Sequence, residues 1–422
     1  MRISIHTLGT RGDVQPYVAL ARSLSRNGHE VQLAGPAQFD RFVTENGVSF
    51  FPLPGEFLTL LDTPDGKAAI ASGQGYSAGF KLLKHVRPLM RRLLDTDWAA
   101  AQTFRPDLLV YHPKSIAAPY IAQRLSIKAV LASPLPGFTP TSAFPTPMLP
   151  FSSLGPLNKV SHQLAIRGAD FLFSKVLKEW GHLSLGLTRI TRVCPDATLY
   201  AYSRHVVPVP NDWNERVFVS GYWFLNDEAS WHMPPGLAKF LADGDIPIYV
   251  GFGSMPGIDP ERFAREIVNG LDRAGKRGLL AIGGGALEMT SVPNHVHVVG
   301  AAPHGQLFKH VSAALHHGGA GTTAASLRAG LPTIICPFFG DQPFWARRVA
   351  HLGAGPQALD RKTLTADKMA AAFLRTDDSV MRSKANELGQ AIRQEDGLAQ
   401  AVRIIEQVAS SPAHGRCVMR IT

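Results

Sequence analysis

The chain has 422 residues, a length that predicts two domains. Hydrophobic residues make up 45% of it and charged residues 18%, so large buried cores are expected. Its 43 Lys and Arg outnumber 33 Asp and Glu, for a net charge of +10, which favours anionic ligands. The basic residues are scattered, which argues against nucleic-acid binding through a basic tail.

Cysteine content and hydropathy indicate in which cellular compartment the protein is expected. The three cysteines lie far apart, which argues against a disulfide framework and leaves no zinc-ligand spacing. The first residues enter a strand pattern directly and lack the apolar stretch of a secretory signal, so we expect a cytoplasmic protein. No run of 18 or more apolar residues occurs, so we expect any contact with a membrane, such as its inner face, to be peripheral.

The first half opens with a β-turn-α-β pattern. Residues 2–8 are rich in β-forming types and lead into a glycine-rich turn at residues 9–13. Apolar residues at helical spacing predict a helix over residues 16–27, which Gly28 is placed to end because glycine adopts a positive φ without cost. Residues 31–34 form the next predicted strand, and this order is the unit of a doubly wound parallel sheet.

The second half repeats this alternation of strands and helices. Predicted helices cover residues 260–274 and 322–328, and glycine-rich turns follow several of the strands. The sequence therefore predicts a second α/β domain. Its predicted strands are residues 246–252, 279–282, 296–299, 313–316 and 333–336.

Composition divides the chain into segments. Residues 222–245 are rich in Trp, Pro, Asn and Asp and are predicted to link a first domain, residues 1–221, to a second, residues 246–409. Residues 410–422 are predicted to be a tail. Residues 134–156 carry many prolines and aromatics without a period, which is typical of a long functional loop or lid.

The most informative segment is Leu315-His-His-Gly-Gly-Ala-Gly-Thr-Thr323. An apolar strand ends in two histidines, and a glycine-rich turn leads into a helix. The backbone N–H groups of a helix N-terminus bind phosphate, and glycines let the backbone approach its oxygens. A histidine at the strand end can donate a hydrogen bond to a diphosphate leaving group. The alternative is a tight turn with Thr322 as a simple helix cap, but the paired histidines favour a phosphate site.

Two further segments carry weaker evidence. Cys336-Pro-Phe-Phe-Gly-Asp-Gln-Pro-Phe-Trp345 places Asp341 and Gln342 in an aromatic loop, which suits the hydroxyls and C–H faces of a sugar, although Asp341 alone could cap the next helix. Asp13 lies at the first strand-to-helix turn and could accept a proton from a hydroxyl, or merely complement the helix dipole.

These segments together resemble the UDP-glycosyltransferase family, and most closely its sterol 3-β-glucosyltransferase branch. The resemblance is carried by Gly9-Thr-Arg-Gly-Asp-Val-Gln-Pro16, by Tyr249-Val-Gly-Phe-Gly-Ser-Met255, and by the stretch from Gly300 to Trp345. It implies the GT-B fold: α/β, with two Rossmann-like, doubly wound parallel-sheet domains facing a central cleft. It also implies inverting transfer of a hexose, glucose first, from a UDP-sugar to a hydroxyl of a lipophilic acceptor such as a sterol or terpenoid.

The resemblance also assigns roles to residues. Asp13 would be the general base, and neither a metal nor a cofactor beyond the UDP-sugar co-substrate is implied. His112, which follows the predicted strand over residues 108–111, would pair with Asp13. We expect a neighbouring histidine or an apolar acceptor pocket to raise the pKa of Asp13 and so make it a better base. The donor would be bound by the following residues: Arg11, Gly12, Ser254, His304, His317, Gly319, Ala320, Gly321, Thr322, Thr323, Asp341 and Gln342.

The sequence departs from the plant members at the nucleobase site. Their uracil-stacking Trp would fall near Ala301, and their ribose-binding Glu near Ala325, so neither side chain is present. Pro303 and His304 could seat the base through backbone groups instead. The acidic pairs at residues 95–97 and 243–245 do not follow strands, which argues against a metal site there.

The acceptor side is less determined. Phe57, Phe138, Phe144 and Met148 lie in loop-like stretches and suggest an apolar acceptor pocket, although such residues are more often core. Three functions stay open at this point. They are transfer to a lipophilic acceptor, tailoring of a polyketide, flavonoid, glycopeptide or envelope glycolipid with a UDP- or dTDP-sugar, and sugar-nucleotide binding without catalysis.

Overall fold

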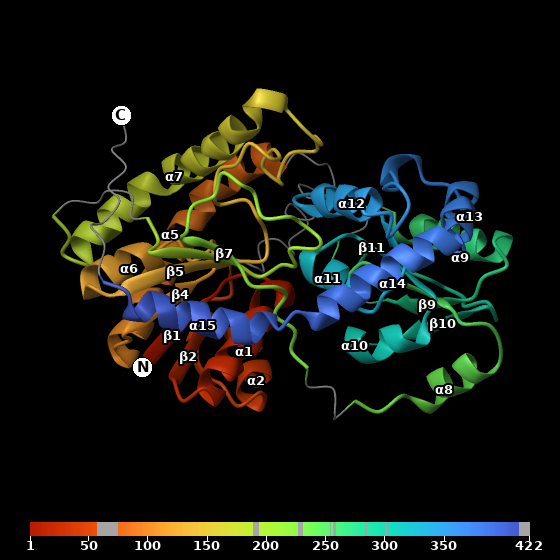
Figure 1. Ribbon diagram of the computed structural model, residues 1–422, viewed down its shortest axis with the longest axis horizontal. Helices are drawn as coiled ribbons and strands as arrows, with labels where there is room; N and C mark the ends of the chain where they lie inside the picture. The colour runs from red at the N-terminus through yellow and green to blue at the C-terminus, as the bar shows by residue number, and fades with distance from the viewer. Residues whose placement is uncertain are drawn as a thin grey trace.

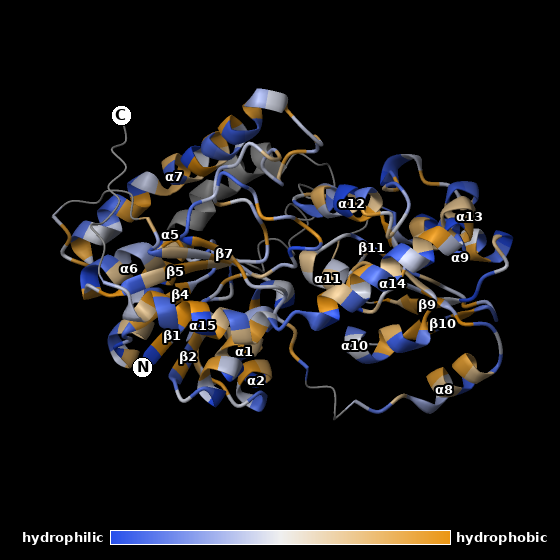
Figure 2. Ribbon diagram, in the orientation of Figure 1, coloured by the Kyte–Doolittle hydropathy of each residue, from blue (hydrophilic) through white to orange (hydrophobic). Residues whose placement is uncertain are grey.

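The computed structural model describes residues 1–56, 75–188, 194–226, 231–253, 255, 259–282, 285–300 and 302–412, with side chains in the long helix α5 from Leu89 onward. Figure 1 shows two lobes, each built around a parallel sheet with helices on its faces. In Figure 2 the central strands are coloured as hydrophobic, as expected for strands that are covered on both sides.

The first sheet has seven strands in the order β3-β2-β1-β4-β5-β6-β7, and all neighbours are parallel. This is the doubly wound arrangement predicted from the sequence. The strands are β1 (Arg2–His6), β2 (Glu30–Pro36), β3 (Ser49–Leu53), β4 (Leu108–Tyr111), β5 (Lys128–Ser133), β6 (Ala197–Tyr200) and β7 (Val217–Val219). The helices are α1 (Arg11–Arg26), α2 (Asp40–Glu45), α5 (Gly75–Phe104), α6 (Ala118–Leu125) and α7 (Asn158–Leu183).

Helix α1 begins earlier than the sequence pattern suggests. The glycine-rich turn was predicted to span residues 9–13, with the helix starting at Pro16, but α1 already begins at Arg11. Thr10 caps the helix and Asp13 lies in its first turn, so the backbone is helical before the proline. Gly28 has a φ of +83° and follows the end of α1, as predicted.

The second sheet has five parallel strands in the order β10-β9-β8-β11-β12. Its strands are β8 (Ile248–Gly251), β9 (Gly278–Ala281), β10 (Val296–Val299), β11 (Ala313–His316) and β12 (Thr333–Ile335). The helices in the second half of the chain are α8 (Pro235–Ala242), α9 (Pro260–Arg273), α10 (His304–Leu307), α11 (Ala320–Arg328), α12 (Gln342–His351), α13 (Ala366–Arg375), α14 (Ser379–Gln394) and α15 (Gly397–Ser410).

The last helix returns to the first domain. Ile404 and Ile405 of α15 are buried in the same core as Ile3 and Leu20, and α15 lies against α1. Figure 1 shows α15, in blue, beside β1, β2 and α1. The division by composition placed residues 397–409 with the second domain, whereas the apolar face of α15 is covered by the first.

One long loop of the first domain has no regular secondary structure. Between β5 and α7 the chain forms no helix or strand until the short 3-10 turn Gly155–Leu157, so residues 134–154 are a long loop, as predicted. None of the described helices is long and apolar enough to cross a membrane.

Candidate functional site

One cluster of polar residues lies where the strand order of the first sheet reverses. β1 is flanked by β2 and β4, so the loops that follow β1 and β4 diverge at this point, where α/β sheets bind ligands. The loop after β1 leads to Asp13, and the loop after β4 carries His112 and Lys114. The structure thus brings Asp13 and His112 together and adds Lys114, which the sequence pattern did not single out.

Asp13 has hydrogen-bond donors at both carboxylate oxygens. Its Oδ1 lies 3.3 Å from His112 Nε2. Its Oδ2 lies 2.8 Å from Lys114 Nζ, 2.9 Å from Thr10 N and 3.3 Å from Thr10 Oγ1. The bond from Thr10 N belongs to a capping box at the start of α1, so Asp13 also has the helix-capping role weighed from the sequence.

The tautomer of His112 follows from its neighbours. The backbone N–H of Lys114 donates to His112 Nδ1 at 3.1 Å, so this nitrogen is an acceptor. His112 is buried, which lowers its pKa, and the neutral ring therefore carries its proton on Nε2, facing Asp13. His112 is thus positioned to donate to the carboxylate of Asp13.

The electrostatic state of Asp13 differs from the expectation. Sequence reasoning held that a neighbouring histidine or apolar surroundings would raise its pKa. Burial does favour the neutral acid, but the Lys114 ammonium and the His112 hydrogen bond outweigh it and hold the pKa of Asp13 below its usual range. The expectation was wrong because it did not include Lys114, and Asp13 is a stable carboxylate at neutral pH.

A second cluster lies at the corresponding point of the second sheet. β8 is flanked by β9 and β11, and His317 directly follows β11. The loop after β8 lies beside it, because a Cβ built on Gly253 would be 3.4 Å from His317 Cε1. Ser254, predicted to contact the diphosphate, lies outside the described residues.

The two adjacent histidines at the end of β11 have different environments. His316 is fully buried, accepts from Gly318 N at 3.0 Å and has Ser326 Oγ 3.3 Å from Nε2, so its ring supports the turn. His317 Nδ1 is buried without a hydrogen-bond partner among the described residues. Burial and the neighbouring His304 lower the pKa of His317 to about 4, so its ring is neutral and has a nitrogen to offer a ligand.

The predicted phosphate turn forms the N-terminus of α11. Gly319 precedes the helix, and a Cβ there would lie 2.5 Å from His317 Nε2, so only glycine leaves room for that ring. Gly321 is exposed, and Ala320 and Thr322 are partly exposed, so their N–H groups lie at an accessible helix end. Thr323 is fully buried instead, and its N–H donates to Gly319 O at 2.9 Å.

His304 lies on the second domain near the first. Its ring stacks on Phe308, with 4.8 Å between centroids, and its Nε2 lies 3.3 Å from Tyr249 Oη. Burial, and then the charge of Arg11, lower the pKa of His304 to about 4. Arg11 belongs to the first domain, at the start of α1, so its charge acts on His304 across the domain boundary.

The pKa of Asp341 also depends on charged residues of the first domain. Its Oδ2 accepts from Trp345 Nε1 at 2.7 Å within α12. Burial raises its pKa, and the negative charge of Asp13 raises it further, while Lys114 lowers it. The carboxyl groups of Asp13 and Asp341 therefore interact electrostatically across the domain boundary.

The side chain of Gln342 forms hydrogen bonds within its own loop. Its Oε1 accepts from Phe338 N at 2.6 Å and Phe339 N at 3.1 Å, and its Nε2 lies 3.3 Å from Met255 Sδ. The side chain is 4% exposed. Its carbonyl is committed to the backbone, which leaves the amide nitrogen as the group able to contact a sugar.

The predicted acceptor residues are separated. Phe138 and Met148 are exposed, at 37% and 45%. Phe144 packs between the domains, 5.7 Å from the ring of Phe344, so it contributes to their contact and not to an open pocket wall. Phe57 lies outside the described residues.

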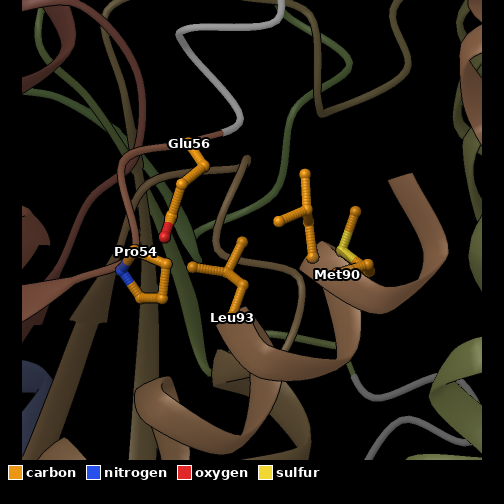
Figure 3. Close-up of a pocket in the computed structure, with 5 residues that line it drawn as sticks. Pro54, Glu56, Met90 and Leu93 are labelled. Atoms are coloured by element: carbon orange, nitrogen blue, oxygen red, sulfur yellow. The ribbon is translucent and has the colours of Figure 1, made fainter. Parts of the chain in front are cut away.

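A small hollow lies beside the carboxyl end of β3. Figure 3 shows Pro54 and Glu56 on one side and Met90 and Leu93 of α5 on the other, and Leu89 completes the lining. The hollow is mainly apolar, with the Glu56 carboxylate at its rim, 3.0 Å from an Arg92 nitrogen. It lies in the first domain, which the sequence predicts to bind the acceptor.

A buried histidine–aspartate pair in the first domain was not found from the sequence. His6 Nδ1 lies 2.6 Å from Asp97 Oδ1, and His6 Nε2 lies 2.8 Å from Ser4 Oγ. All three side chains are almost fully buried, so the network joins β1 to α5 and does not face a substrate. Asp95 is held by Arg91, Trp180 and Ser184, so neither acid of the pair at residues 95–97 is directed at an open site.

Two parallel-sheet domains with polar clusters at both switch points define the GT-B class of glycosyltransferase. Two domain families match the chain: the glycosyltransferase family 28 N-terminal domain, over residues 3–144, and the erythromycin biosynthesis protein CIII-like C-terminal domain, over residues 279–408. Solved structures agree on the fold. CalG4, the calicheamicin glycosyltransferase, has a TM-score of 0.70 at 22% identity and covers 98% of this chain and 99% of its own. The glycosyltransferase SnogD from Streptomyces nogalater has a TM-score of 0.67 at 24% identity and covers 97% of this chain and 99% of its own.

Sequence relatives are more specific. Sterol 3-beta-glucosyltransferase UGT80B1 of Arabidopsis thaliana is 35% identical, over 95% of this chain and 67% of that protein. The sterol 3-beta-glucosyltransferase of Aspergillus fumigatus is also 35% identical, over 96% of this chain but 30% of its own length. The chain belongs to the UDP-glycosyltransferase family and is similar to its sterol 3-beta-glucosyltransferases. It spans under a third of the fungal relative and about two thirds of the plant one.

Proposed function

We propose that this protein is an inverting, metal-independent glycosyltransferase that moves glucose from UDP-glucose to a hydroxyl of a lipophilic acceptor such as a sterol or terpenoid. The observation that carries the proposal is a polar cluster at the switch point of each sheet. Asp13, a partly buried carboxylate, lies at the switch point of the first sheet beside His112 and Lys114. His317, whose Nδ1 has no hydrogen-bond partner among the described residues, and the N-terminus of α11 lie at the switch point of the second sheet.

In this proposal Asp13 is the general base. Oδ2 already has three donors, from Lys114 and Thr10, whereas Oδ1 has only His112. A carboxylate has about four lone-pair positions, so Oδ1 is where an acceptor hydroxyl would donate. As the acceptor oxygen bonds to the anomeric carbon, its proton passes to Asp13, and the bond from that carbon to the diphosphate breaks on the opposite face.

The leaving diphosphate gains negative charge in the transition state. A nitrogen of the His317 ring and the N–H groups at the start of α11 would stabilise that charge, which is the role that a metal ion has in other transferases. Asp341 and the amide nitrogen of Gln342 would hold the sugar hydroxyls. Arg11, across from His304, would add positive charge at the nucleotide end.

The choice of donor and acceptor rests on the relatives. The sequence relatives named above are sterol 3-beta-glucosyltransferases, which supports glucose as the sugar and a sterol-like alcohol as the acceptor. A second candidate is the tailoring of a natural product with a dTDP-sugar. It is favoured by the likeness in fold to the glycosyltransferase VinC, whose structure is a complex with dTDP (TM-score 0.68, 18% identity, covering 97% of this chain and 99% of that one).

A donor and acceptor panel tests the proposal. UDP-glucose, UDP-galactose and dTDP-glucose are each combined with a sterol, a flavonoid and a macrolide, with EDTA present, and nucleotide release and product are measured. We expect a sterol β-glucoside from UDP-glucose, at a rate that EDTA does not change. Transfer only from dTDP-glucose would establish the second candidate, and formation of an α-glucoside would contradict inversion.

A further inference from the structure

Exposed apolar side chains gather on one stretch of the first domain. Among the described residues, 17 large hydrophobic side chains are exposed, and nine of them lie in residues 138–183. Isolated exposed hydrophobic residues are normal, but a gathering of this kind marks an interaction surface. The nine are Phe138, Met148, Phe151, Leu157, Val160, Leu164, Phe171, Leu172 and Leu183.

The gathering follows the outer face of α7. Leu157, just before the helix, and Val160, Leu164 and Phe171 within it are spaced by three, four and seven residues, so they share one side of the helix. Phe171 is 84% exposed. The exposed Arg167 lies on the same side between Leu164 and Phe171, and the exposed Lys175 and Lys178 continue this side toward the end of the helix. We call residues 157, 160, 164, 167, 171, 175 and 178 the α7 stripe.

The opposite side of α7 is anchored to the domain. Ser161 and His162 are buried near its start, and Leu177 and Trp180 near its end. Trp180 Nε1 donates to Asp95 of α5 at 2.9 Å. The stripe therefore faces outward on a helix that is fixed in place, and Figure 2 shows hydrophobic and hydrophilic residues alternating along α7 at the edge of the lobe.

The apolar half of the stripe lies nearer the second domain. Arg347 of α12 donates to Pro150 O at 2.8 Å and to Leu149 O at 3.1 Å, and these residues are in the loop that leads into α7. The exposed side chains of Met148 and Phe151 flank that contact. The apolar end is thus beside the domain boundary, and the basic end points away from it.

We propose that the α7 stripe is a docking surface for an anionic lipid bilayer. Leu164 and Phe171 would enter the headgroup region, while Lys175 and Lys178 would contact acidic headgroups. Helices that lie in a membrane interface combine such an apolar face with lysines in this way. Docking itself does not depend on the proposed reaction, but it would hold the acceptor side against the phase in which a lipophilic alcohol dissolves.

Charge placement argues against a second copy as the occupant. α7 has four basic residues, Lys159, Arg167, Lys175 and Lys178, and two acidic ones, Asp170 and Glu179. In a parallel pair of α7 helices, Lys175 and Lys178 would face their own copies. In an antiparallel pair they would face the apolar half, leaving ammonium groups buried without partners. A bilayer with acidic headgroups pairs with the lysines and also offers the apolar side chains of the stripe a hydrophobic phase.

Vesicle co-sedimentation tests the proposal with the whole chain. Wild type is mixed with vesicles of phosphatidylcholine alone and with vesicles of phosphatidylcholine and phosphatidylserine. We expect binding to the mixed vesicles that weakens as salt is raised. Leu164→Ser with Phe171→Ser, and separately Lys175→Glu with Lys178→Glu, should each weaken binding on the order of tenfold. The matched control is Val380→Ser on α14, which is 61% exposed and should bind as wild type does.

Two further readouts make the result decisive. Glucosyl transfer to a cyclodextrin-solubilised acceptor should be the same in wild type and both double variants, so a loss of vesicle binding cannot be ascribed to misfolding or to failure of the proposed reaction. Equal vesicle binding by wild type and both double variants would overturn the proposal. So would a dimer in solution that Leu164→Ser with Phe171→Ser dissociates, since the stripe would then be an interface between copies.

Discussion

Lys114 determines the charge state of the proposed base, although no local pattern identifies it. Its ammonium lies 2.8 Å from Asp13 Oδ2, and its backbone N–H fixes the tautomer of His112. Its side chain is 55% exposed, so the contact with Asp13 is accessible to solvent and to a substrate. One residue therefore acts on both members of the pair.

Replacing Lys114 with methionine should shift the pH dependence of transfer. Asp13 accepts a proton only when ionised, so activity is lost as the pH falls through its pKa. Removing the ammonium raises that pKa, because burial is then opposed only by His112 and Thr10, so the acid limb of kcat/KM should move to higher pH. Lys114→Arg keeps the positive charge and should restore the wild-type limb. An unchanged profile in Lys114→Met would show that Lys114 does not act on the base.

His112→Ala tests the pairing with Asp13. Loss of the Nε2 donor leaves Oδ1 without its hydrogen bond, and we expect kcat to fall on the order of tenfold or more while KM for the sugar nucleotide is unchanged. The exposed His351→Ala is the control and should behave as wild type. Normal turnover in His112→Ala would rule out a role for the pair.

At the scale of single residues, the sequence pattern predicted the functional residues that follow strands. It did not predict the residues that contact them and set their charge or orientation. Asp13, His112 and His317 follow strands β1, β4 and β11, and the β-α alternation alone placed them at sheet edges. The roles of Lys114 and of the pair of His6 and Asp97 depend on contacts between residues two to 101 positions apart, and neither composition nor period is unusual around them.

The turn between β11 and α11 is the element on which the donor site depends. A Cβ at Gly319 would lie 2.5 Å from His317 Nε2, so Gly319→Ala must displace that ring. We expect weaker binding of UDP by calorimetry, roughly tenfold or more, with little change in the melting temperature. Gly168→Ala on α7, where a Cβ meets nothing within 4 Å, is the control. Unaltered UDP affinity in Gly319→Ala would argue against a donor role for His317.

The hydrophobic pattern of the sequence predicted where helices and strands lie more accurately than where they begin and end. Strands β4, β10 and β11 have the predicted bounds, because apolar runs between turn residues define buried strands. Helix α1 begins five residues before Pro16, because the capping of Thr10 and Asp13 stabilises a first turn that lacks an apolar period.

At the scale of the whole molecule, the chain crosses between domains twice at one place. Gly397 packs against the backbone of Gly221 and Tyr222, where a Cβ on Gly397 would lie 2.4 Å from Tyr222 O, so the outward and returning segments lie side by side. The return of α15 was not predictable, since its helical period shows that one face is apolar but not which core covers it.

Acid should destabilise the folded protein through its buried histidines. Burial lowers the pKa of His304 and His317 to about 4 from 6.5, and that of His316 well below 6.5. The unfolded chain therefore binds more protons between about pH 6.5 and 4, so stability is present above this window and is lost as the pH falls through it. Each pKa unit corresponds to about 1.4 kcal/mol. The melting temperature should fall on acidification, less so in His317→Gln; a constant value across the window would contradict this.

The most direct test of the account is glucosyl transfer by Asp13→Asn, measured with UDP-glucose and a sterol alongside UDP binding by calorimetry. The amide keeps the size of the side chain but cannot accept the proton. We predict a loss of transfer of about 100-fold or more, because a positioned base contributes at least that much, with UDP affinity equal to that of wild type. Transfer at the wild-type rate by Asp13→Asn would contradict the proposed base and the mechanism built on it.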